Sequence, residues 1–192
     1  MKKIPSLFYR SDDDPNGICI DSVNPLCEWV MRDEGIATAK FDGTACAVIK
    51  GKIYKRYDNS RLISKDNRVQ KTKPLDTWVH CDDHTDRGKF IYWIPLSTTD
   101  YYHHIAWAWE HWELSDGTYE LVGPGVQDNP HNFSSNGLVR HGCILIHALK
   151  PSYDSIRDFL KESSCEGIVW HHPDGRMAKI TKEKFGFPWP II

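Results

Sequence analysis

The alternation of apolar and polar residues along the chain predicts mostly short strands. Three of them follow one another between residues 36 and 57, separated by the turn sequences Asp42-Gly43 and Lys50-Gly51. We expect these strands to span Ile36–Lys40, Thr44–Ile49 and Lys52–Tyr57. A further strand is expected over Tyr119–Val122, and an apolar one over Cys143–Leu149.

Two segments have the apolar spacing of helices. In Ser152–Glu162 the apolar residues recur every three or four positions, which is typical of an amphipathic helix, and Tyr101–Trp112 carries aromatic residues at a similar spacing. Gly167–His171 and Arg176–Ile180 flank the turn Pro173-Asp174-Gly175 as a hairpin. Strands with two or three helices predict an α+β fold with antiparallel sheets.

The composition favours one water-soluble globular domain over residues 1–192. A chain of 192 residues is the usual size of a single domain, and eight Trp, eight Tyr and seven Phe can fill a core, so disorder is excluded. The mean hydropathy is −0.52 and no apolar run approaches the roughly 18 residues of a membrane span. We also find no secretory signal after Met1, so a cytoplasmic location is expected.

The six cysteines predict free thiols rather than a disulfide framework. No two of them form a C-x-x-C pair, and a chain of this size does not need covalent staples. Cys46 and Cys143 lie in apolar stretches, so both are expected in the core.

One segment concentrates positive charge. Between Lys50 and Lys73 there are nine Lys or Arg residues against Asp58 and Asp66, whereas the whole chain has a formal net charge of −2. Such a segment indicates a polyanion bound at one place. A solvated lysine-rich strand and loop is the alternative explanation.

Lys40-Phe41-Asp42-Gly43, where a predicted strand meets a turn, is the sharpest chemical signal. A lysine nucleophile must be neutral to attack, and an unperturbed lysine is charged at pH 7. Burial, neighbouring cations or a metal-bound phosphate can remove that charge. The four residues alone are weak support, because Asp-Gly turns after a lysine are common.

Four further segments follow this motif in order. They are Lys55-Arg56, Tyr119-Glu120-Leu121-Val122-Gly123, Glu166-Gly167-Ile168-Val169-Trp170 and Met177-Ala178-Lys179-Ile180. Together the five segments resemble nucleotidyltransferase motifs I, Ia, III, IV and V of the covalent ligase and capping superfamily. In detail they are most similar to the ATP-dependent 5′-phosphate/3′-hydroxyl RNA ligase family, over residues 27 to 185.

This resemblance implies a minimal adenylyltransferase domain with an ATP-grasp-like nucleotidyltransferase fold and no C-terminal OB domain. It also implies a reaction in three steps, with ATP and Mg²⁺ (or Mn²⁺) as cofactors. Lys40 would take AMP from ATP, the AMP would pass to an RNA 5′-phosphate, and a 3′-hydroxyl would displace it. The implied partner is RNA with 5′-phosphate and 3′-hydroxyl ends; no membrane is implied, and protein partners are unknown.

The resemblance assigns roles residue by residue. Lys40 would be catalytic and Glu166 would hold the metal. Glu120 would hold the ribose, Lys179 the α-phosphate, and Arg56 a phosphate of nucleotide or RNA. The nucleotide-binding set is Asp42, Gly43, Arg56, Glu120, His141, Lys179 and Lys182. The RNA-binding set is Lys55, Arg56, Arg61 and Lys65.

A geometric argument adds to the resemblance. If Asp174-Gly175 is a two-residue hairpin loop, Trp170 pairs with Lys179, and Glu166 and Lys179 lie on one face of the hairpin. A three-residue loop would put them on opposite faces.

The sequence also departs from the family pattern. Motif V usually has two lysines one residue apart, but Thr181 stands at the second position, and Lys182 or Lys184 is the possible substitute. His141 is the nearest candidate for the aromatic that stacks on the base, and a loop histidine without ligand is an equal alternative.

Two other clusters favour structural explanations. His80-Cys81-Asp82-Asp83-His84 and the histidines 103, 104 and 111 lack the regular spacing of zinc ligands. Trp107, Trp109 and Trp112 are expected to pack in the core, although aromatics can also stack on unpaired RNA bases.

Three functions therefore remain open. The first is an ATP-dependent RNA ligase with Lys40 as nucleophile. The second is another covalent nucleotidyltransferase, either GTP-dependent capping or DNA ligase type. The third is a catalytically weakened nucleic-acid-binding module, which the threonine at position 181 motivates.

Overall fold

The computed structural model describes residues 4–58, 75–81 and 91–190. The chain forms two compact units, which we describe separately. The first comprises Ile4–Asp42, Gln127–Asn132 and His141–Ile192, and the second comprises Met1–Lys3, Gly43–Val126 and Phe133–Arg140. We call them the three-stranded unit and the six-stranded unit after their main sheets. The chain passes between them inside the Lys40–Gly43 motif, and a single domain over residues 1–192 stays a prediction.

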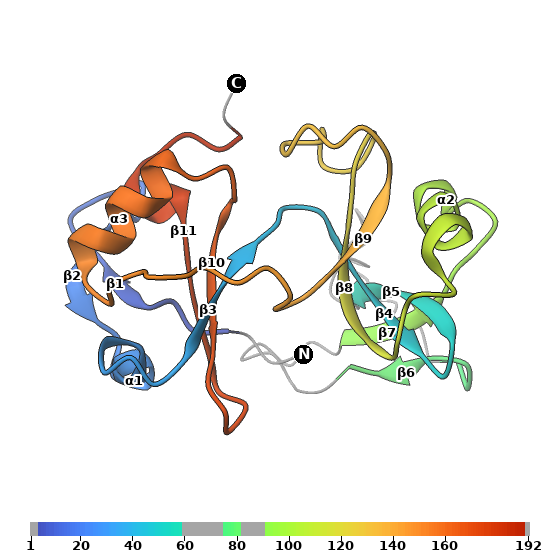
Figure 1. Ribbon diagram of the computed structural model, residues 1–192, viewed down its shortest axis with the longest axis horizontal. Helices are drawn as coiled ribbons and strands as arrows, with labels where there is room; N and C mark the ends of the chain where they lie inside the picture. The colour runs from blue at the N-terminus through green and yellow to red at the C-terminus, as the bar shows by residue number, and fades with distance from the viewer. Residues whose placement is uncertain (1–3, 59–74, 82–90, 191–192) are drawn as a thin grey trace, which may run out of the picture. The chain divides into compact units, whose positions relative to one another are not determined.

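The three-stranded unit is built on an antiparallel sheet in the order β11-β10-β3 (Figure 1). Its strands are β3 (Ile36–Lys40), β10 (Gly167–His171) and β11 (Met177–Thr181). A smaller sheet pairs β1 (Phe8–Arg10) with β2 (Cys19–Val23). The helical segments are η1 (Pro25–Cys27), α1 (Glu28–Met31), α3 (Tyr153–Glu162) and η3 (Lys182–Phe185).

Only one face of the three-stranded sheet enters the core of its unit. Ile168, Ala178 and Ile180 are at most 1% exposed, and they belong to one buried cluster with Ile156 and Leu160 of α3. Ser152 begins α3 by accepting a hydrogen bond from the backbone N–H of Ser155. Because side chains alternate along a strand, the residues between these buried positions point to the opposite face of the sheet.

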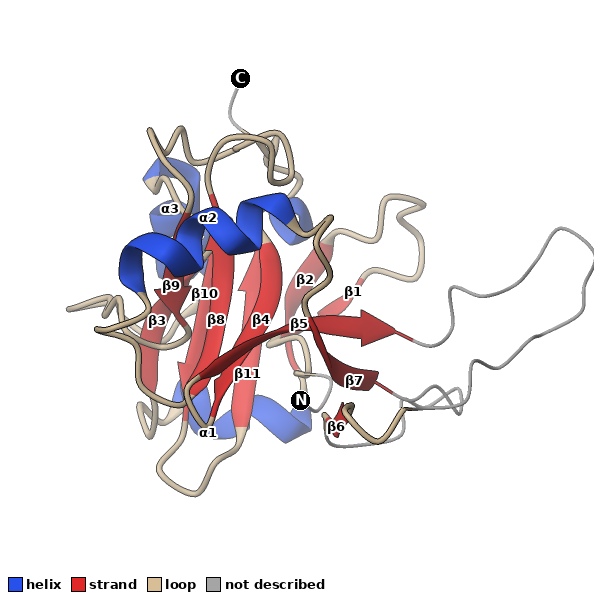
Figure 2. Cartoon of the chain, turned by 90° about the vertical axis from the view of Figure 1, so that its right-hand side faces the viewer, coloured by secondary structure: helices blue, strands red, loops and turns tan. Residues whose placement is uncertain are grey.

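The six-stranded unit contains an antiparallel sheet in the order β6-β7-β5-β4-β8-β9. Its strands are β4 (Thr44–Ile49), β5 (Lys52–Asp58), β6 (Val79–His80), β7 (Ile91–Pro95), β8 (Gly117–Val122) and β9 (Gly137–Arg140). Helix α2 (Tyr101–Glu110) lies across one face of this sheet (Figure 2). Both faces are packed: Ala106 of α2 lies in one cluster with Cys46 and Tyr119, and Ala47 and Trp93 lie in another.

The predicted α+β class with antiparallel sheets is confirmed, and the strands expected over Ile36–Lys40 and Thr44–Ile49 have the expected bounds. The structure does not test the nucleotidyltransferase identity of the fold, which remains a proposal. No helix among the described residues combines the length and apolarity that a membrane crossing requires.

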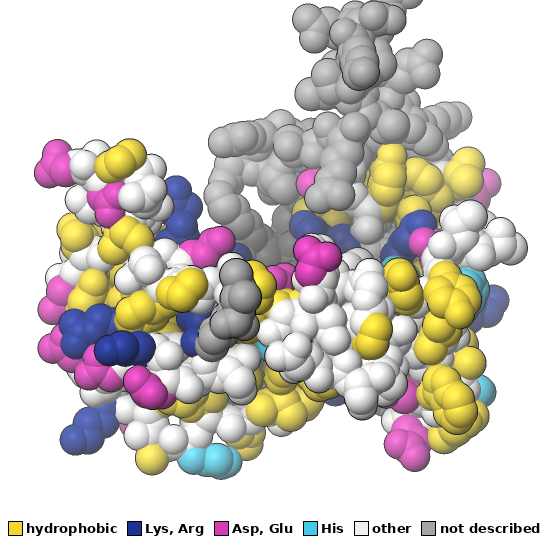
Figure 3. Space-filling view, turned by 90° about the horizontal axis from the view of Figure 1, so that it is seen from above, with side chains coloured by type: hydrophobic (Ala, Val, Ile, Leu, Met, Phe, Trp, Pro, Cys, Tyr) yellow, Lys and Arg dark blue, Asp and Glu magenta, His cyan; other side chains and the backbone are white. Residues whose placement is uncertain are grey.

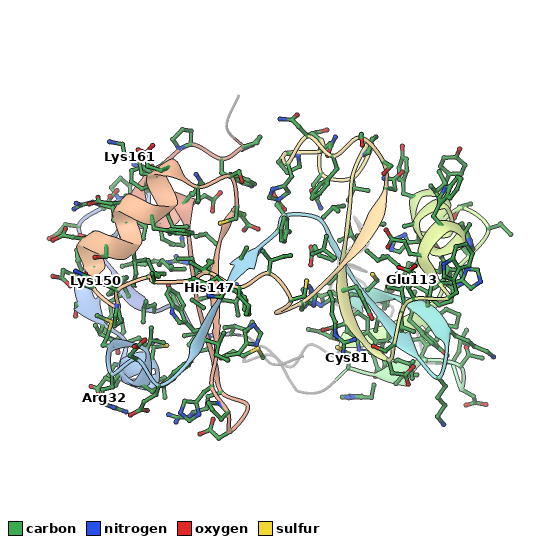
Figure 4. The ribbon with its side chains drawn as sticks, in the orientation of Figure 1. Arg32, Cys81, Glu113, His147, Lys150 and Lys161 are labelled. Atoms are coloured by element: carbon green, nitrogen blue, oxygen red, sulfur yellow. The ribbon has the colours of Figure 1, made fainter. Side chains whose placement is uncertain are left out.

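The strand predicted over Cys143–Leu149 is wrong. This segment, which carries His147 (Figure 4), makes one isolated bridge to β3, between Leu145 and Thr38. Ile144 and Leu145 are 47% and 49% exposed and Cys143 is also exposed, so the expected core position of Cys143 is wrong as well. The segment lies along the edge of β3, where the N–H of Ile146 donates to the carbonyl of Ala37, and of its apolar residues Ile146 and Leu149 pack against the buried cluster.

Candidate functional site

Lys40 and Glu166 form a charged pair in the three-stranded unit. Lys40 is the last residue of β3, and Glu166 directly precedes β10, the neighbouring strand. The backbone N–H of Glu166 donates to the carbonyl of Lys40 at 3.1 Å, which fixes the two residues at the same end of the sheet. The Lys40 ammonium donates to Oε2 of Glu166 in an ion pair. The two side chains are 27% and 17% exposed, so solvent and a ligand can reach the pair.

The strand register puts Lys40, Lys179 and Thr181 on one face of the sheet. Gly167 lies opposite Lys40 on one side and opposite Thr181 on the other, and Lys179 lies opposite Val169. Side chains at these positions alternate with the buried ones, so they point away from the core. This face therefore offers two lysines beside a carboxylate, a combination that can bind phosphate groups.

Of the two geometries expected for the second hairpin, the structure has the three-residue loop, so the shared face of Glu166 and Lys179 that a two-residue loop would give is absent. Trp170 pairs with Ala178, and Lys179 pairs with Val169. The reason is a three-residue loop: the N–H of His172 donates to the carbonyl of Arg176, leaving residues 173–175 between them. A proline and then a left-handed glycine, here Gly175 at φ 90°, are typical of such a loop. Glu166 instead reaches Lys40 from the position before its strand.

Gly167 leaves no room for a side chain between these strands. A Cβ at this position would lie 2.3 Å from the carbonyl oxygen of Ile180 and 3.0 Å from Cα of Thr181. Both neighbours are backbone atoms, which cannot move without disturbing β11. The glycine is therefore needed for the close approach of β10 and β11 beside Lys40.

Lys182 belongs to the core of the unit rather than to the face of Lys179. Its side chain is 1% exposed, and its Nζ donates to the carbonyl of Ser163 at 2.6 Å. Burial lowers the pKa of Lys182. This contact favours a structural role for Lys182 over the nucleotide-binding role expected from the sequence. Thr181, rather than Lys182, lies on the same face of the sheet as Lys40.

Asp42 is held by two residues that sequence reasoning missed. Its backbone N–H donates to Nε2 of His131 at 2.8 Å, and its carboxylate accepts from Nε1 of Trp189 at 2.9 Å. Both partners are far from Asp42 in sequence, and neither lies in a recognisable motif. Only the spatial approach of three loops reveals them.

Arg56 and Glu120 share one face of the sheet in the six-stranded unit. Glu120 of β8 lies opposite Ala45 of β4. Because Lys55 lies opposite Cys46, the next residue of β5, Arg56, falls beside Ala45 on that same face. Gly43 approaches β8 closely, since a Cβ there would lie 2.2 Å from the carbonyl oxygen of Leu121.

Lys55 lies on the opposite face and has a partner. Its Nζ donates to both carboxylate oxygens of Asp100, at 2.6 and 2.8 Å. Burial alone would raise the pKa of Asp100, but hydrogen bonds from Lys55 and from Ser97 outweigh it and lower the pKa to about 2. Lys55 is thus separated from Arg56 by the sheet. The other two predicted RNA-binding residues, Arg61 and Lys65, lie outside the described residues.

His141 lies near His171 of β10. A Cβ at Gly142 would be 3.3 Å from the ring of His171, and burial together with the charge of His141 lowers the pKa of His171. Nε2 of His171 is 3.2 Å from the hydroxyl of Thr38, which itself donates to the carbonyl of Val169. The base-stacking role of His141 remains a prediction.

The tryptophans of α2 are divided between core and surface. Trp107 packs against the buried cluster, whereas Trp109 and Trp112 are 72% and 67% exposed, so their expected core packing is wrong. The helix turns His103 and Ala106 inward, and at 3.6 residues per turn Trp109 lies about 120° around the helix axis from His103. The exposed residues line a shallow apolar groove with Tyr101 and Ile105, and hydrophobic side chains gather over α2 in Figure 3.

None of the six cysteines forms a disulfide, and five of them are buried, as predicted for Cys46. Burial raises the pKa of the Cys46 thiol to about 12 and that of Cys27 to about 11. In the part of the chain that the structure describes, no group of three or more His, Cys, Asp or Glu residues is arranged to hold a metal ion. Asp82, Asp83 and His84 lie outside that part.

Comparison with known proteins bears on the motifs directly. A sequence model of the family described as RNA ligase 1 matches residues 108–192. This span contains Glu120, Glu166 and Lys179, and it begins after Lys40 and Arg56.

Three relatives share that description. RNA ligase 1 of Pongo abelii is 37% identical over 90 residues, covering 41% of this chain and 27% of the relative. RNA ligase 1 of Danio rerio is 33% identical over 88 residues, with the same coverage of 41% and 27%. RNA ligase 1 of Mus musculus is 23% identical over 223 aligned positions, covering 81% of this chain and 68% of the relative. The first two matches thus span about a quarter of the relatives' length. The resemblance to RNA ligases that the sequence motifs indicate is confirmed as a similarity to proteins described as RNA ligase 1.

Proposed function

We propose that this chain is an ATP-dependent RNA ligase in which Lys40 carries AMP. The observation that supports this most directly is the partly exposed Lys40–Glu166 pair at the end of a sheet face that also carries Lys179. A nucleophile, a carboxylate and a second cation are the groups that a nucleotidyl transfer needs at one place.

In the first proposed step, the neutral amine of Lys40 attacks the α-phosphorus of ATP. A P–N bond forms, the bond from the α-phosphorus to the β-phosphate oxygen breaks, and pyrophosphate leaves with the electron pair. The ammonium must first lose a proton to solvent or to a carboxylate. Lys179 would stabilise the negative charge that grows on the α-phosphate oxygens.

In the second and third steps, two different oxygens attack. An RNA 5′-phosphate oxygen takes the AMP from Lys40 and restores the free lysine. An RNA 3′-hydroxyl then attacks that 5′-phosphate, forms the phosphodiester bond and releases AMP. RNA as the substrate is supported by the similarity to proteins described as RNA ligase 1 and by the run of basic residues that begins at Lys50.

Glu166 fits the proposed Mg²⁺ (or Mn²⁺) by its chemistry. Mg²⁺ is usually held by one or two carboxylates together with substrate phosphates and waters, so a dedicated cage of protein ligands is not required. When bound, such a cation would compete with the Lys40 ammonium for the Glu166 carboxylate and would favour the neutral amine.

The remaining residues divide between ligand and framework roles. We propose that Glu120 holds the ribose and that Arg56 holds a phosphate, since both lie on one face of their sheet. The buried Lys182 is assigned to the framework instead. The free, mostly buried thiols support the proposal of a reducing cytoplasmic compartment.

A strand-joining assay tests this function. The protein is incubated with Mg²⁺, ATP and RNA strands that carry a labelled 5′-phosphate and a 3′-hydroxyl, and parallel reactions contain GTP or DNA strands. We expect ATP-dependent joining of RNA. Transfer from GTP alone would indicate capping chemistry, preference for DNA would indicate a DNA ligase, and RNA binding without joining would indicate a weakened binding module.

A further inference from the structure

His131 is hydrogen-bonded on both sides of its ring. Its Nε2 accepts from the backbone N–H of Asp42 at 2.8 Å, and its Nδ1 lies 3.3 Å from the carbonyl oxygen of Ser164. An imidazole nitrogen that accepts an N–H carries no proton, so the ring is neutral and its proton is on Nδ1. Nδ1–H then donates to the Ser164 carbonyl. Each ring nitrogen therefore has one defined role.

These two contacts lie at equal distances in sequence from the charged pair. Asp42 follows Lys40 by two residues, and Ser164 precedes Glu166 by two residues. One imidazole thus connects the backbone after the lysine with the backbone before the glutamate. A second link joins the same two segments within the sheet: the backbone N–H of Glu166 donates to the carbonyl of Lys40.

Aromatic rings hold the imidazole in place. The ring centroids of His131 and Phe41 are 5.0 Å apart, and those of His131 and Trp189 are also 5.0 Å apart. Trp189 donates its indole N–H to Asp42 as well, so it contacts the ring and one of the ring's partners. The Nζ of Lys182 lies 5.9 Å from the Trp189 ring centre and donates to Ser163, which adjoins Ser164.

We propose that His131 is a positioning residue, supported by Trp189, that sets the distance between Lys40 and Glu166 through its two hydrogen bonds. It acts on the pair through its hydrogen bonds to Asp42 and Ser164. The inference rests on the proposed function of Lys40 for its catalytic consequence. A displacement of about 1 Å at a reacting group can cost about 100-fold in rate.

Two substitutions at position 131 separate hydrogen bonding from ring packing. His131→Gln keeps an acceptor for Asp42 and a donor for Ser164, because a carboxamide offers both. His131→Phe keeps the ring between Phe41 and Trp189 but removes both hydrogen bonds. The measurements are the single-turnover rate of lysyl-AMP formation, the dissociation constant of ATP, and the melting temperature.

We expect His131→Phe to lower the rate about 30- to 100-fold while the dissociation constant of ATP changes less than about threefold. We expect His131→Gln to stay within about fivefold of the wild-type rate. Equal rates in the two variants would overturn the proposal. So would a loss in His131→Phe that is entirely a loss of ATP affinity.

A second measurement is independent of activity. The thermal shifts of His131→Phe and Glu166→Gln are compared with the shift of the double variant, because residues that act through one contact do not add. We expect the melting temperature of the double variant to fall by less than the sum of the two single shifts. A fall equal to that sum would overturn the positioning role. If wild-type protein takes no AMP from ATP, the proposed function fails, and this cycle alone decides whether His131 positions the pair.

Discussion

The two main sheets use their faces differently. In the three-stranded unit one face is packed into a core, and the other carries Lys40, Lys179 and Thr181. In the six-stranded unit buried clusters lie on both faces, and Lys55 is bound to Asp100. Both Lys40 and Lys55 are ion-paired, Lys40 with Glu166 and Lys55 with Asp100, but Lys40 lies on the sheet face opposite the core of its unit, whereas Lys55 lies on the face that packs against α2. A basic residue on a strand gains its role from the face that it occupies.

The largest expected effect is on the rate of lysyl-AMP formation, and it distinguishes Glu166 of the three-stranded unit from Glu120 of the six-stranded unit. We expect Glu166→Gln to lower the rate of lysyl-AMP formation about 1,000-fold, because charge stabilisation near a reacting phosphate is worth that much. We expect Glu120→Gln to weaken ATP binding about tenfold with a much smaller change in rate. Single-turnover kinetics across ATP concentrations separates the two effects. Glu183→Gln, at an exposed position of η3, is the matched control.

A comparison of two glycines tests how closely β10 and β11 pack. We expect Gly167→Ala to lower the free energy of unfolding by about 3 kcal/mol or more, because the new Cβ would lie 2.3 Å from a backbone oxygen. Gly51→Ala, in the β4–β5 turn at φ 68°, meets nothing within 4 Å and costs only the left-handed strain of about 1–2 kcal/mol. Urea unfolding measures both. Equal losses would contradict the close approach.

The Lys55–Asp100 pair predicts a dependence of stability on pH. The pKa of Asp100 is lowered to about 2, so its stabilising effect is complete above the usual aspartate pKa near 4. We expect Asp100→Asn to cost about 1–2 kcal/mol at pH 7. The difference from wild type should shrink as the pH falls from 4 towards 2. Urea unfolding at several pH values checks this, and a difference that grows with acidity would contradict it.

The smallest effect concerns the thiols. Cys143 is exposed, whereas burial holds the pKa of Cys46 near 12 and that of Cys27 near 11. We expect one fast-reacting thiol in the native protein, lost in Cys143→Ser without a change in stability beyond about 0.5 kcal/mol. Titration with a chromogenic thiol reagent measures the number of fast-reacting thiols per chain. Rapid reaction of the buried thiols would show that the cores open readily.

Local signals in the sequence predicted the strands well and the pairing of one hairpin poorly. The turn Lys50-Gly51 has a two-residue signature, and the strands beside it, which pair Ile49 with Lys52, have nearly the expected ends. In the second hairpin Pro173 begins a three-residue loop, and one added residue moves every partner to the opposite face. The missing N–H of Pro173 was the available signal against its expected pairing in the strand.

Contacts between distant segments could not be predicted in the same way. Lys40 and Glu166 were found from their motifs, but the roles of His131 and Trp189 depend on three loops that meet only in the folded chain. Lys182 was expected to bind nucleotide, but its side chain is buried and its ammonium donates to the carbonyl of Ser163. The exposed Trp109 and Trp112 show the converse, since composition alone favoured burial.

The central claim is that Lys40 accepts AMP, and direct mapping of the adduct tests it. The protein is incubated with Mg²⁺ and α-labelled ATP, digested, and the modified peptide is sequenced by mass spectrometry, with Lys40→Ala and the exposed α3 variant Lys161→Ala in parallel (Figure 4). We expect an AMP phosphoramidate on Lys40 in the wild type and in Lys161→Ala, and none in Lys40→Ala. AMP on another residue, or equal labelling of Lys40→Ala, would contradict the account.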